Sequence, residues 1–333
     1  MIMGAREVTL KPSGHSFTVK GGETILAAAR RAGIWLPFEC GWGSCGTCKA
    51  TLAEGQVRCL FPEAPALSER DRRRRRVILC QSVPESDVVL EARVLDGPPE
   101  NLNTSEYHAV LADVETLAPE VARFRFQLDR PADYRPGQYA ILHLGDGLRR
   151  AYSMANLPGT REMELIARRY PNGPGSQTLF ALSPGAELTL ELPYGAAYLR
   201  ETSRPLVFVA GGTGIAPILG LTREWTSRGD RRGNGLMIFY GARTPGDLVC
   251  LDELRELTRS FSQAQVIPAV NEGDAGWEGE VGLVTDALVR RLKEPWDEHE
   301  FYMAGPPVMV QAVLALLEER GVPITRVHYD SFG

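Results

Sequence analysis

The stretch Cys40-Gly-Trp-Gly-Ser-Cys45-Gly-Thr-Cys48, followed at a distance by Cys80, decides the fold of the N-terminal part of this chain. Its spacing, C-x4-C-x2-C with a remote fourth cysteine, is the ligand spacing of plant-type 2Fe-2S clusters. Two irons bridged by sulfide need four thiolates, and glycines between three of them allow the backbone to fold into one tight loop. The sequence therefore predicts an iron-sulfur cluster held by Cys40, Cys45, Cys48 and Cys80.

A structural zinc site is the alternative interpretation of the same cysteines. Zinc loops usually contain two closely spaced cysteine pairs, whereas Cys80 has no neighbouring partner in the sequence. The pattern therefore favours the cluster over zinc. Cys59 and Cys250 lie outside the pattern and are expected to be ordinary half-buried thiols.

The composition is that of an ordinary globular protein, with 333 residues, of which 44% are hydrophobic and 24% are charged. This length suggests two or three domains. A net charge of -5 argues against nucleic acid as a partner. The weakly polar stretch 205–221 is rich in glycine and proline and too short to cross a membrane, so no membrane partner is expected. The N-terminus shows no secretory signal, and the spaced thiols favour a reducing compartment, so we expect a cytoplasmic protein.

The N-terminal pattern predicts a small α+β domain. Residues 6–19 form two extended runs around a Pro-Ser-Gly turn, which is typical of a hairpin. Residues 23–32 are rich in helix formers and end before Gly33, as a capped helix would. With the cysteine loop these elements predict an α+β ferredoxin (β-grasp) domain over residues 1–96. The turn-rich residues 97–104 are expected to form a linker.

The pattern of predicted secondary structure changes once in the rest of the chain, at residue 204. Apolar and polar residues alternate over 122–128, which places Arg123, Arg125 and Gln127 on a solvent-facing side of the strand. Further strands are expected at 138–144, 163–168 and 187–192, and together these strands predict an antiparallel β-barrel over residues 105–203. From residue 204 short buried strands at 206–210, 236–240, 266–270 and 301–304 alternate with helical stretches such as 308–319. This alternation predicts an α/β domain with a parallel sheet over residues 204–333.

Three further motifs accompany the cysteines: Arg150-Ala-Tyr152-Ser153 after a strand, Gly211-Gly-Thr-Gly214-Ile-Ala-Pro217 between a strand and a helix, and Gly305-Pro-Pro307. Residues 35–82 resemble the N-terminal ferredoxin domain of oxygenase reductase components. The motifs of the following two domains resemble those of ferredoxin-NADP reductases. The resemblance covers essentially the whole chain, and it implies that residues 105–203 bind FAD and residues 204–333 bind a nicotinamide dinucleotide.

The resemblance implies the flavin contacts. Arg150 would pair with the FAD phosphates, which suits a planar cation with several donors. Tyr152 would lie against the isoalloxazine ring and Ser153 would donate near its N5. The alternative is that Tyr152 is a barrel core aromatic and Arg150 a solvated charge. The full set of expected flavin contacts is Arg150, Tyr152, Ser153, Ile166, Arg168, Gly175 and Ser176.

A glycine turn at a helix N-terminus lets backbone amides approach a pyrophosphate, which is the chemistry expected after residue 210. Arg243 follows the next strand, where relatives contact the adenosine ribose. It would suit a 2'-phosphate, but the nearby Asp247 would oppose one, and the resemblance favours NADH over NADPH. The expected nicotinamide contacts are Gly212, Thr213, Gly214, Arg243, Gly305 and Pro306. The C-terminal Phe332 resembles an aromatic that covers the flavin, although it would also serve as a hydrophobic anchor.

The implied reaction is hydride transfer from NADH to FAD, followed by single-electron steps through the cluster, with Ser153 and Phe332 beside the reacting flavin. Reductases of ring-hydroxylating dioxygenases, among them those for carbazole, are most similar in pattern. The acceptor would then be a terminal oxygenase or an intermediate ferredoxin. Reductases of di-iron monooxygenases and of CDP-deoxysugar dehydration share the domain order and stay open. A redox sensor without turnover is the alternative from a different class of function.

Residues 72–76 are five consecutive arginines shortly before Cys80. Opposite charges accelerate the encounter of two proteins, so this run would suit docking of an acidic partner close to the cluster. Runs of like charge are more often simply solvated. The sequence leaves both interpretations open.

Overall fold

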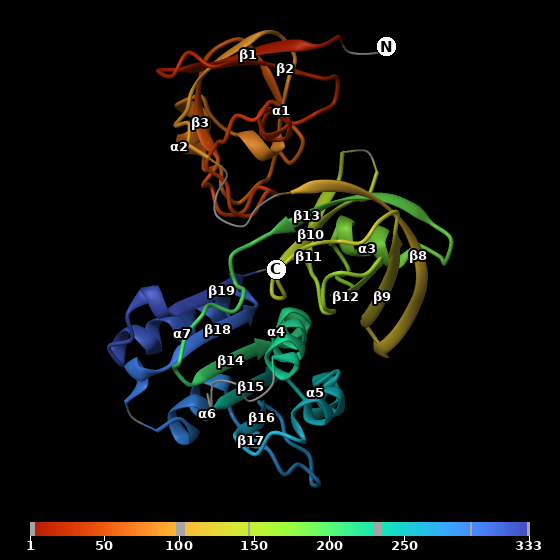
Figure 1. The fold of residues 1–333 in the computed structure, drawn as a ribbon, viewed down its shortest axis with the longest axis vertical. Coiled ribbons are helices and arrows are strands. Elements are labelled where there is room, and N and C mark those ends of the chain that lie inside the picture. The colour runs from red at the N-terminus through yellow and green to blue at the C-terminus, as the bar shows by residue number, and fades with distance from the viewer. Residues whose placement is uncertain (1–3, 98–103, 146, 229–234, 294, 332–333) are drawn as a thin grey trace. The chain divides into compact units, whose positions relative to one another are not determined.

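The computed structural model describes residues 4–97, 104–145, 147–228, 235–293 and 295–331 (Figure 1). These residues divide into two compact units, the first made of residues 1–105 with 141–151 and the second of residues 106–140 with 152–333. Most of the expected linker and the whole of Phe332 lie outside the described residues. The exact boundaries of the three expected domains stay a prediction.

The first unit contains a mixed five-stranded sheet in the order β2-β1-β7-β3-β5. The expected hairpin is present, because β1 and β2 pair antiparallel, while β1 and β7 pair parallel. A sheet of this kind with one helix across it is the predicted β-grasp arrangement. Its elements are β1 (Arg6–Lys11), β2 (Ser16–Val19), α1 (Ile25–Arg31), β3 (Lys49–Glu54), β4 (Val57–Cys59), α2 (Glu69–Arg73), β5 (Arg76–Ile78), β6 (Ser82–Pro84) and β7 (Val88–Glu91).

Helix α1 begins where its sequence supplies a cap. The Thr24 hydroxyl accepts a hydrogen bond from the amide of Ala27 at 3.3 Å, which satisfies one of the free donors of the first turn. Its apolar residues, including Ile25 and Leu26, are buried. Arg30 and Arg31 lie in the last turn, where a positive charge opposes the negative end of the helix dipole.

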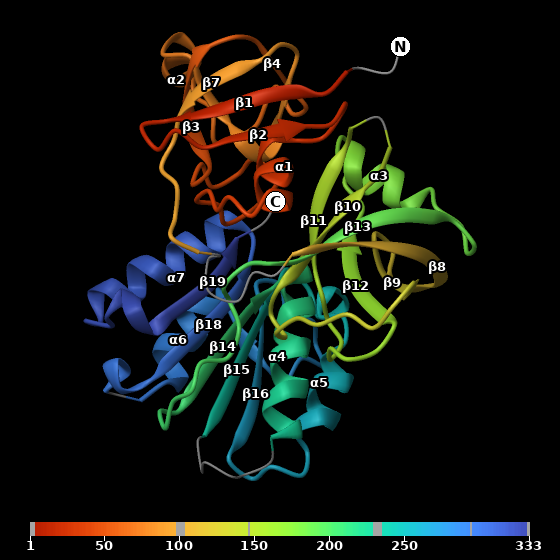
Figure 2. The ribbon, with the colours of Figure 1, turned by 45° about the horizontal axis from the view of Figure 1, so that its top comes forward.

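A second sheet holds six strands in the order β11-β10-β13-β8-β9-β12 (Figure 2). Strand β9 pairs antiparallel with both β8 and β12. The four strands predicted in this region are present, each within two residues of its expected bounds. The elements are β8 (Ser105–Ala118), β9 (Val121–Leu128), β10 (Tyr139–His143), β11 (Arg149–Ser153), β12 (Glu162–Arg168), α3 (Pro174–Phe180) and β13 (Glu187–Tyr194).

The third sheet is parallel throughout, in the order β17-β16-β15-β14-β18-β19. Strands added after β14 extend the sheet to one side, and β18 and β19 extend it to the other, so the strand order reverses between β14 and β18. Ligands of such sheets bind at the carboxyl ends of the strands beside this reversal. The elements are β14 (Leu206–Gly211), α4 (Ile215–Ser227), β15 (Leu236–Ala242), α5 (Leu251–Thr258), β16 (Ala264–Val270), β17 (Glu280–Val281), α6 (Val284–Arg291), β18 (Glu300–Gly305), α7 (Pro307–Glu319) and β19 (Val327–Ser331).

Both faces of the parallel sheet are buried, as continuous apolar strands predict. Phe208 of β14 packs in the core on the side of α4 and α5, while its neighbours Val207 and Val209 pack in the core on the side of α6 and α7 (Figure 2). The glycine turn after β14 therefore follows a strand that is buried on both faces of the parallel sheet. No helix in the described part of the chain combines the length and the apolarity needed to cross a membrane.

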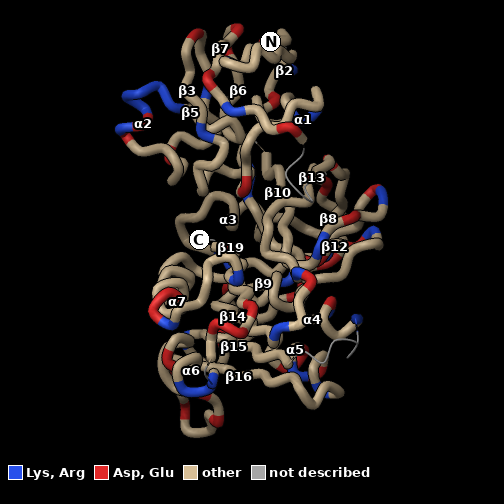
Figure 3. Tube along the Cα trace, turned by 60° about the vertical axis from the view of Figure 1, so that its left-hand side comes forward, with Lys and Arg blue, Asp and Glu red and all other residues tan. Residues whose placement is uncertain are grey.

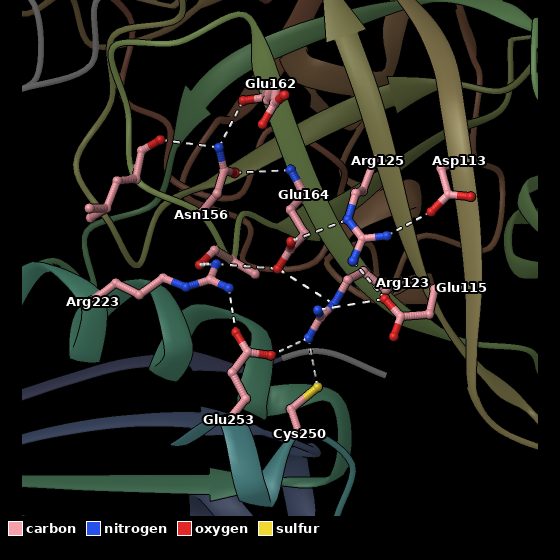
Figure 4. Close-up of polar contacts among 12 residues, drawn as sticks. Asp113, Glu115, Arg123, Arg125, Asn156, Glu162, Glu164, Arg223, Cys250 and Glu253 are labelled. Atoms are coloured by element: carbon pink, nitrogen blue, oxygen red, sulfur yellow. Dashed lines mark hydrogen bonds and ion pairs between the residues drawn. The ribbon is translucent and has the colours of Figure 1, made fainter. Parts of the chain in front are cut away.

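One expectation for β9 was wrong. The alternating pattern placed Arg123 on a wet face, but the residue is only 8% exposed. Its guanidinium lies 2.5 Å from Glu253 of α5 and 3.6 Å from Glu164 of β12, and Arg223 of α4 pairs with the same two carboxylates (Figure 4). The polar face of β9 is therefore covered at Arg123 by the helices of the parallel sheet, whereas Arg125 further along the strand stays partly exposed. The network fastens the β-sheet of this unit to α4 and α5.

Arg123→Met tests how much this network stabilises the second unit. Removing one partner from a buried ion network leaves uncompensated charge, so we expect the free energy of unfolding to fall by about 3 kcal/mol. The matched control is Arg125→Met on the same strand, because Arg125 is 38% exposed and also pairs with carboxylates, those of Asp113 and Glu115 at 2.6 Å and, at the longer distance of 3.8 Å, that of Glu164. We expect the control to lose less than about 1 kcal/mol. Urea unfolding followed by fluorescence measures both, and equal losses would contradict a special role for the buried network.

Candidate functional site

The four cysteines of the motif meet in the first unit, and they meet as two pairs. The sulfurs of Cys48 and Cys80 are 3.3 Å apart. Cys40 and Cys45 form the other pair, in which the Cys40 thiol hydrogen-bonds to Cys45. Among the described residues, no group of three or more Cys, His, Asp or Glu side chains is arranged to hold one metal ion. Two pairs of thiols suit a cluster with two irons, each taking two thiolates.

Backbone amides of the loop point at the sulfurs. The amides of Ser44 and Cys45 donate to the Cys40 sulfur at 3.3 and 3.4 Å, and the amide of Thr47 donates to the Cys45 sulfur at 3.4 Å. Such hydrogen bonds tune the potential of an iron-sulfur cluster. Gly43 allows this loop, because its φ is +102° and an added Cβ would lie 3.2 Å from Ala64, Ile78 and Gln81.

Within each pair the two thiols shift each other's pKa in opposite directions. The hydrogen bond from Cys40 lowers the pKa of Cys45 to about 5, and the same pairing raises the pKa of Cys40. The hydrogen bond between Cys48 and Cys80 likewise lowers the pKa of Cys48 and raises that of Cys80. A thiol must lose its proton to bind iron, so all four cysteines would be thiolates in a site that holds the cluster.

The surroundings of the thiols also fit a cluster. Gln81 is 2% exposed, and its side-chain nitrogen has no hydrogen-bond partner among the described residues. A buried donor of this kind needs an acceptor such as a sulfide. Arg149, which is 6% exposed, donates to the carbonyl oxygen of Cys80 at 3.0 Å. Its positive charge lies beside a ligand of the cluster and would raise the reduction potential there.

The flavin motif lies along β11. The guanidinium of Arg150 lies 4.7 Å from the ring centre of Phe61, and Tyr152 is half-buried. Ser153 is buried, and its hydroxyl donates to the carboxylate of Asp330 on β19 at 3.2 Å. The structure thus joins the serine of this motif to the carboxyl end of the parallel sheet, where the nicotinamide motifs lie.

Gly175 and Ser176 form the first turn of α3, and both are buried. No side chain caps this helix, so its first amides are left for another acceptor. The Ser176 hydroxyl accepts from the amide of Tyr170 and donates to the carbonyl of Gly173, each at 3.0 Å. The proton of that hydroxyl is therefore already used within the turn.

Ile166 and Arg168 both come from β12, but the structure places their side chains differently. Ile166 is 4% exposed and belongs to the hydrophobic core. Arg168 pairs with Asp247 at 3.2 Å. Burial raises the pKa of Asp247, but hydrogen bonds from Thr244 and Arg168 outweigh it, so the pKa of Asp247 lies below its ordinary value.

The nicotinamide motifs meet at the strand-order reversal of the parallel sheet. Gly212, Thr213 and Gly214 form a 3-10 turn after β14, and Gly305 ends the neighbouring β18. An added Cβ at Gly214 would lie 1.9 Å from the carbonyl oxygen of Ala304, so the two turns touch through their backbones. At Gly212, whose φ is +53°, an added Cβ would meet nothing within 4 Å. The turn therefore presents an open backbone face, which fits the close approach of a pyrophosphate.

Arg243 lies beyond the end of β15 and pairs with Glu272 at 3.0 Å. Both side chains are exposed. The predicted ribose contact is thus already bound to a carboxylate, and Asp247 stands four residues along the chain. Pro306, the last of the expected nicotinamide contacts, is exposed directly after Gly305.

Sequence reasoning missed three features of the site. Arg149 is 69 residues from Cys80, Glu253 is 130 residues from Arg123, and Met309 fills the space beside Gly211, where an added Cβ would lie 2.4 Å from its sulfur. None of these residues belongs to a local pattern that predicts the contact. Arg149 stands directly before the flavin motif, and this position is the one feature of the sequence that could have indicated a role for Arg149.

Three family models match successive parts of the chain. They are the 2Fe-2S iron-sulfur cluster binding domain over residues 8–85, the oxidoreductase FAD-binding domain over residues 108–198 and the oxidoreductase NAD-binding domain over residues 208–315. The chain is therefore an oxidoreductase with FAD, NAD and a 2Fe-2S cluster as its cofactors. The residues described above fit each group.

Relatives that match over nearly the whole chain agree with the three family models. The ferredoxin–NAD(+) reductase component of the alkene monooxygenase system of Xanthobacter autotrophicus is 38% identical, covering 96% of this chain and 98% of the relative. A ferredoxin–NAD(P)(+) reductase of Metapseudomonas resinovorans is 34% identical, covering 95% and 96%. The solved structure of the ferredoxin reductase in carbazole 1,9a-dioxygenase matches with a TM-score of 0.86 at 31% identity, covering 99% of this chain and 98% of that one. The chain belongs to the family of iron-sulfur flavoprotein reductases whose members include the reductase components of oxygenase systems.

Proposed function

We propose that this chain is the NADH-dependent reductase component of a multicomponent oxygenase, delivering electrons to a terminal oxygenase or to an intermediate ferredoxin. The observation that carries the proposal is the pairing of the four thiols in a chain that also has the flavin and nicotinamide motifs. The relatives support it, because they serve both monooxygenase and dioxygenase systems. The free thiols of the cluster favour the cytoplasm, where they stay reduced.

When bound, FAD accepts a hydride from NADH and returns the electrons singly, and the cluster accepts them one at a time. The chain supplies binding and alignment. We infer that Arg150 neutralises the flavin phosphates and that the uncapped first turn of α3, at Gly175 and Ser176, donates its amides to the pyrophosphate. Tyr152 would stack on the flavin ring.

Ser153 and Asp330 would act together beside the flavin. The hydrogen bond between them holds the serine hydroxyl in a defined position, and we infer that the hydroxyl turns to the flavin when that group is bound. Phe332 follows two residues after Asp330, and its covering role stays a proposal. Ile166 would contact the flavin through its backbone, because its side chain is in the core. Arg168 would contribute a positive charge to the flavin site, although it is ion-paired with Asp247.

The nicotinamide would bind over Gly212, Thr213 and Gly214, with Gly305 and Pro306 beside it. We infer a preference for NADH over NADPH. Glu272 neutralises Arg243, and Asp247 neutralises Arg168, so neither arginine offers an uncompensated positive charge to a 2'-phosphate.

The experiment begins with protein reconstituted with iron and sulfide. We expect flavin and iron-sulfur bands in the visible spectrum, bleaching of both by NADH without oxygen, and NADH-dependent reduction of dichlorophenolindophenol and cytochrome c. A preparation with both cofactors but no NADH oxidation would favour a redox sensor instead. A preparation that binds neither cofactor would refute the proposal.

A further inference from the structure

The arginine run forms one edge of the first unit. Helix α2 begins at a capping box, in which Ser68 and Asp71 hydrogen-bond to each other's backbone amides, and six of the seven residues from Arg70 to Arg76 are arginines. All six arginines are exposed. Figure 3 shows this density of positive charge along α2 and the chain that follows it.

Two of the six arginines have a structural role. Arg72 donates to the carbonyl of Pro62. Arg75, whose φ is +53°, donates to the carbonyl of Gly55 at 3.1 Å. The guanidinium groups of the other four have no hydrogen bond or ion pair with any residue that the structure describes, and they are those of Arg70, Arg73, Arg74 and Arg76. Glu69 is exposed beside them and offsets one of these charges.

The run is fixed against the cluster loop. Lys49, next to Cys48, pairs with Asp71 of α2 at 3.0 Å. The amide of Ala66, just before α2, donates to the carbonyl of Gly43 inside the loop at 3.1 Å. These contacts hold the arginines beside the segment that carries the cluster ligands. Of those ligands, Cys40, Cys48 and Cys80 are buried and Cys45 is exposed. The exposed ligand marks the edge through which an electron would leave.

We propose that Arg70, Arg73, Arg74 and Arg76 form the docking face for an acidic protein that accepts single electrons from the cluster. The inference rests on the proposed function and adds the chemistry of the partner. The whole chain carries a net charge of -5, so an acidic partner is repelled by the molecule at long range and needs a local basic face to bind. Four unpaired guanidinium groups at the exit edge provide that face, and they suit carboxylates geometrically. A redox protein gains from this position, whereas a nucleic acid or a membrane does not need to be near the cluster.

The test uses the full chain with both cofactors and two probes of opposite charge, the acidic soluble domain of cytochrome b5 and the basic cytochrome c. In the variant R70Q/R73Q/R74Q/R76Q we expect the second-order rate of cytochrome b5 reduction at low salt to fall about tenfold and to lose most of its salt dependence. The rate with cytochrome c should stay the same or rise. Each rate is divided by the variant's own rate with dichlorophenolindophenol, which reports flavin turnover.

Two controls separate docking from other effects. The variant R70K/R73K/R74K/R76K keeps the charge and should keep the rate. The variant R255Q/R259Q/R290Q/R291Q removes the same number of exposed arginines from α5, α6 and the residue after α5, and should leave the cytochrome b5 rate within twofold of the wild type.

Four outcomes would overturn the docking face: an unchanged cytochrome b5 rate, equal slowing with both cytochromes, equal slowing in the α5 and α6 control, or failure of the lysine variant to keep the rate. A wild type that oxidises no NADH with dichlorophenolindophenol would instead refute the proposed function. The two failures are thus distinguishable.

Discussion

Cys80→Ala is expected to abolish electron delivery to cytochrome c while NADH still reduces the flavin. Cys80 is 1% exposed and is paired with Cys48, and one iron of the cluster would lose one of its two protein ligands. Changes around a metal ligand already cost 10- to 100-fold, so loss of the ligand itself should lower cytochrome c reduction by about 100-fold or more. The visible bands and the electron paramagnetic resonance signal of the reduced cluster should disappear.

The control for this variant is Cys59→Ala. Cys59 is half-buried and its thiol donates to the carbonyl of Phe61 rather than to the motif cysteines. We expect this variant to keep the cluster signal and the rate with cytochrome c. Reduction of dichlorophenolindophenol should continue in both variants, because it reports the flavin. A Cys80→Ala protein that still shows the cluster signal would remove Cys80 from the ligand set.

Gly214→Ala is expected to cause the largest loss at the nicotinamide end. The new methyl group would lie 1.9 Å from the carbonyl oxygen of Ala304 and 2.9 Å from the amide nitrogen of Gly305. Both are backbone atoms and cannot turn aside, so the two turns must separate. A displacement of about 1 Å in a reacting geometry can cost roughly 100-fold, and we expect that loss in kcat/KM for NADH. Overpacking should also lower the free energy of unfolding by about 1–3 kcal/mol.

Gly235→Ala, directly before β15 of the same sheet, is the matched control. Its added Cβ would lie 3.7 Å from the carbonyl oxygen of Gln263, which is an ordinary contact. Steady-state kinetics over a range of NADH concentrations, with flavin content checked in each preparation, compare the two variants. Wild-type kcat/KM in Gly214→Ala would show that the close packing of the two turns is not needed for NADH to bind.

Local sequence determined much of the fold, because the patterns that carry it are short in range. The strands expected at 206–210, 236–240 and 301–304 are present within two residues of their expected bounds. The spacing of the cysteines was enough to predict that the four come together, without any information from the rest of the chain. Hydrophobic periodicity and glycine positions report on a residue's own backbone and on its neighbours, so they predict elements and turns well.

Periodicity failed where a distant residue changed the environment. Arg123 alternates with apolar residues as a solvent-facing arginine would, but Glu253, 130 residues later, covers it. The short helix α2 was also not predicted, because its arginines show no apolar stripe and its existence depends on the capping box at Ser68 and on the contact of Asp71 with Lys49.

By itself, the sequence determined which groups this protein binds: the cysteine spacing, the flavin motif and the glycine turn are each local, and each has its own chemistry. The tertiary structure alone decided how those groups are supported. Arg149 reaches the carbonyl of Cys80, Ser153 reaches Asp330 across 177 residues, and Gly214 touches Ala304. The physical reason is that such contacts depend on strand order and packing, and these follow from burying the whole apolar surface at once rather than from any one segment.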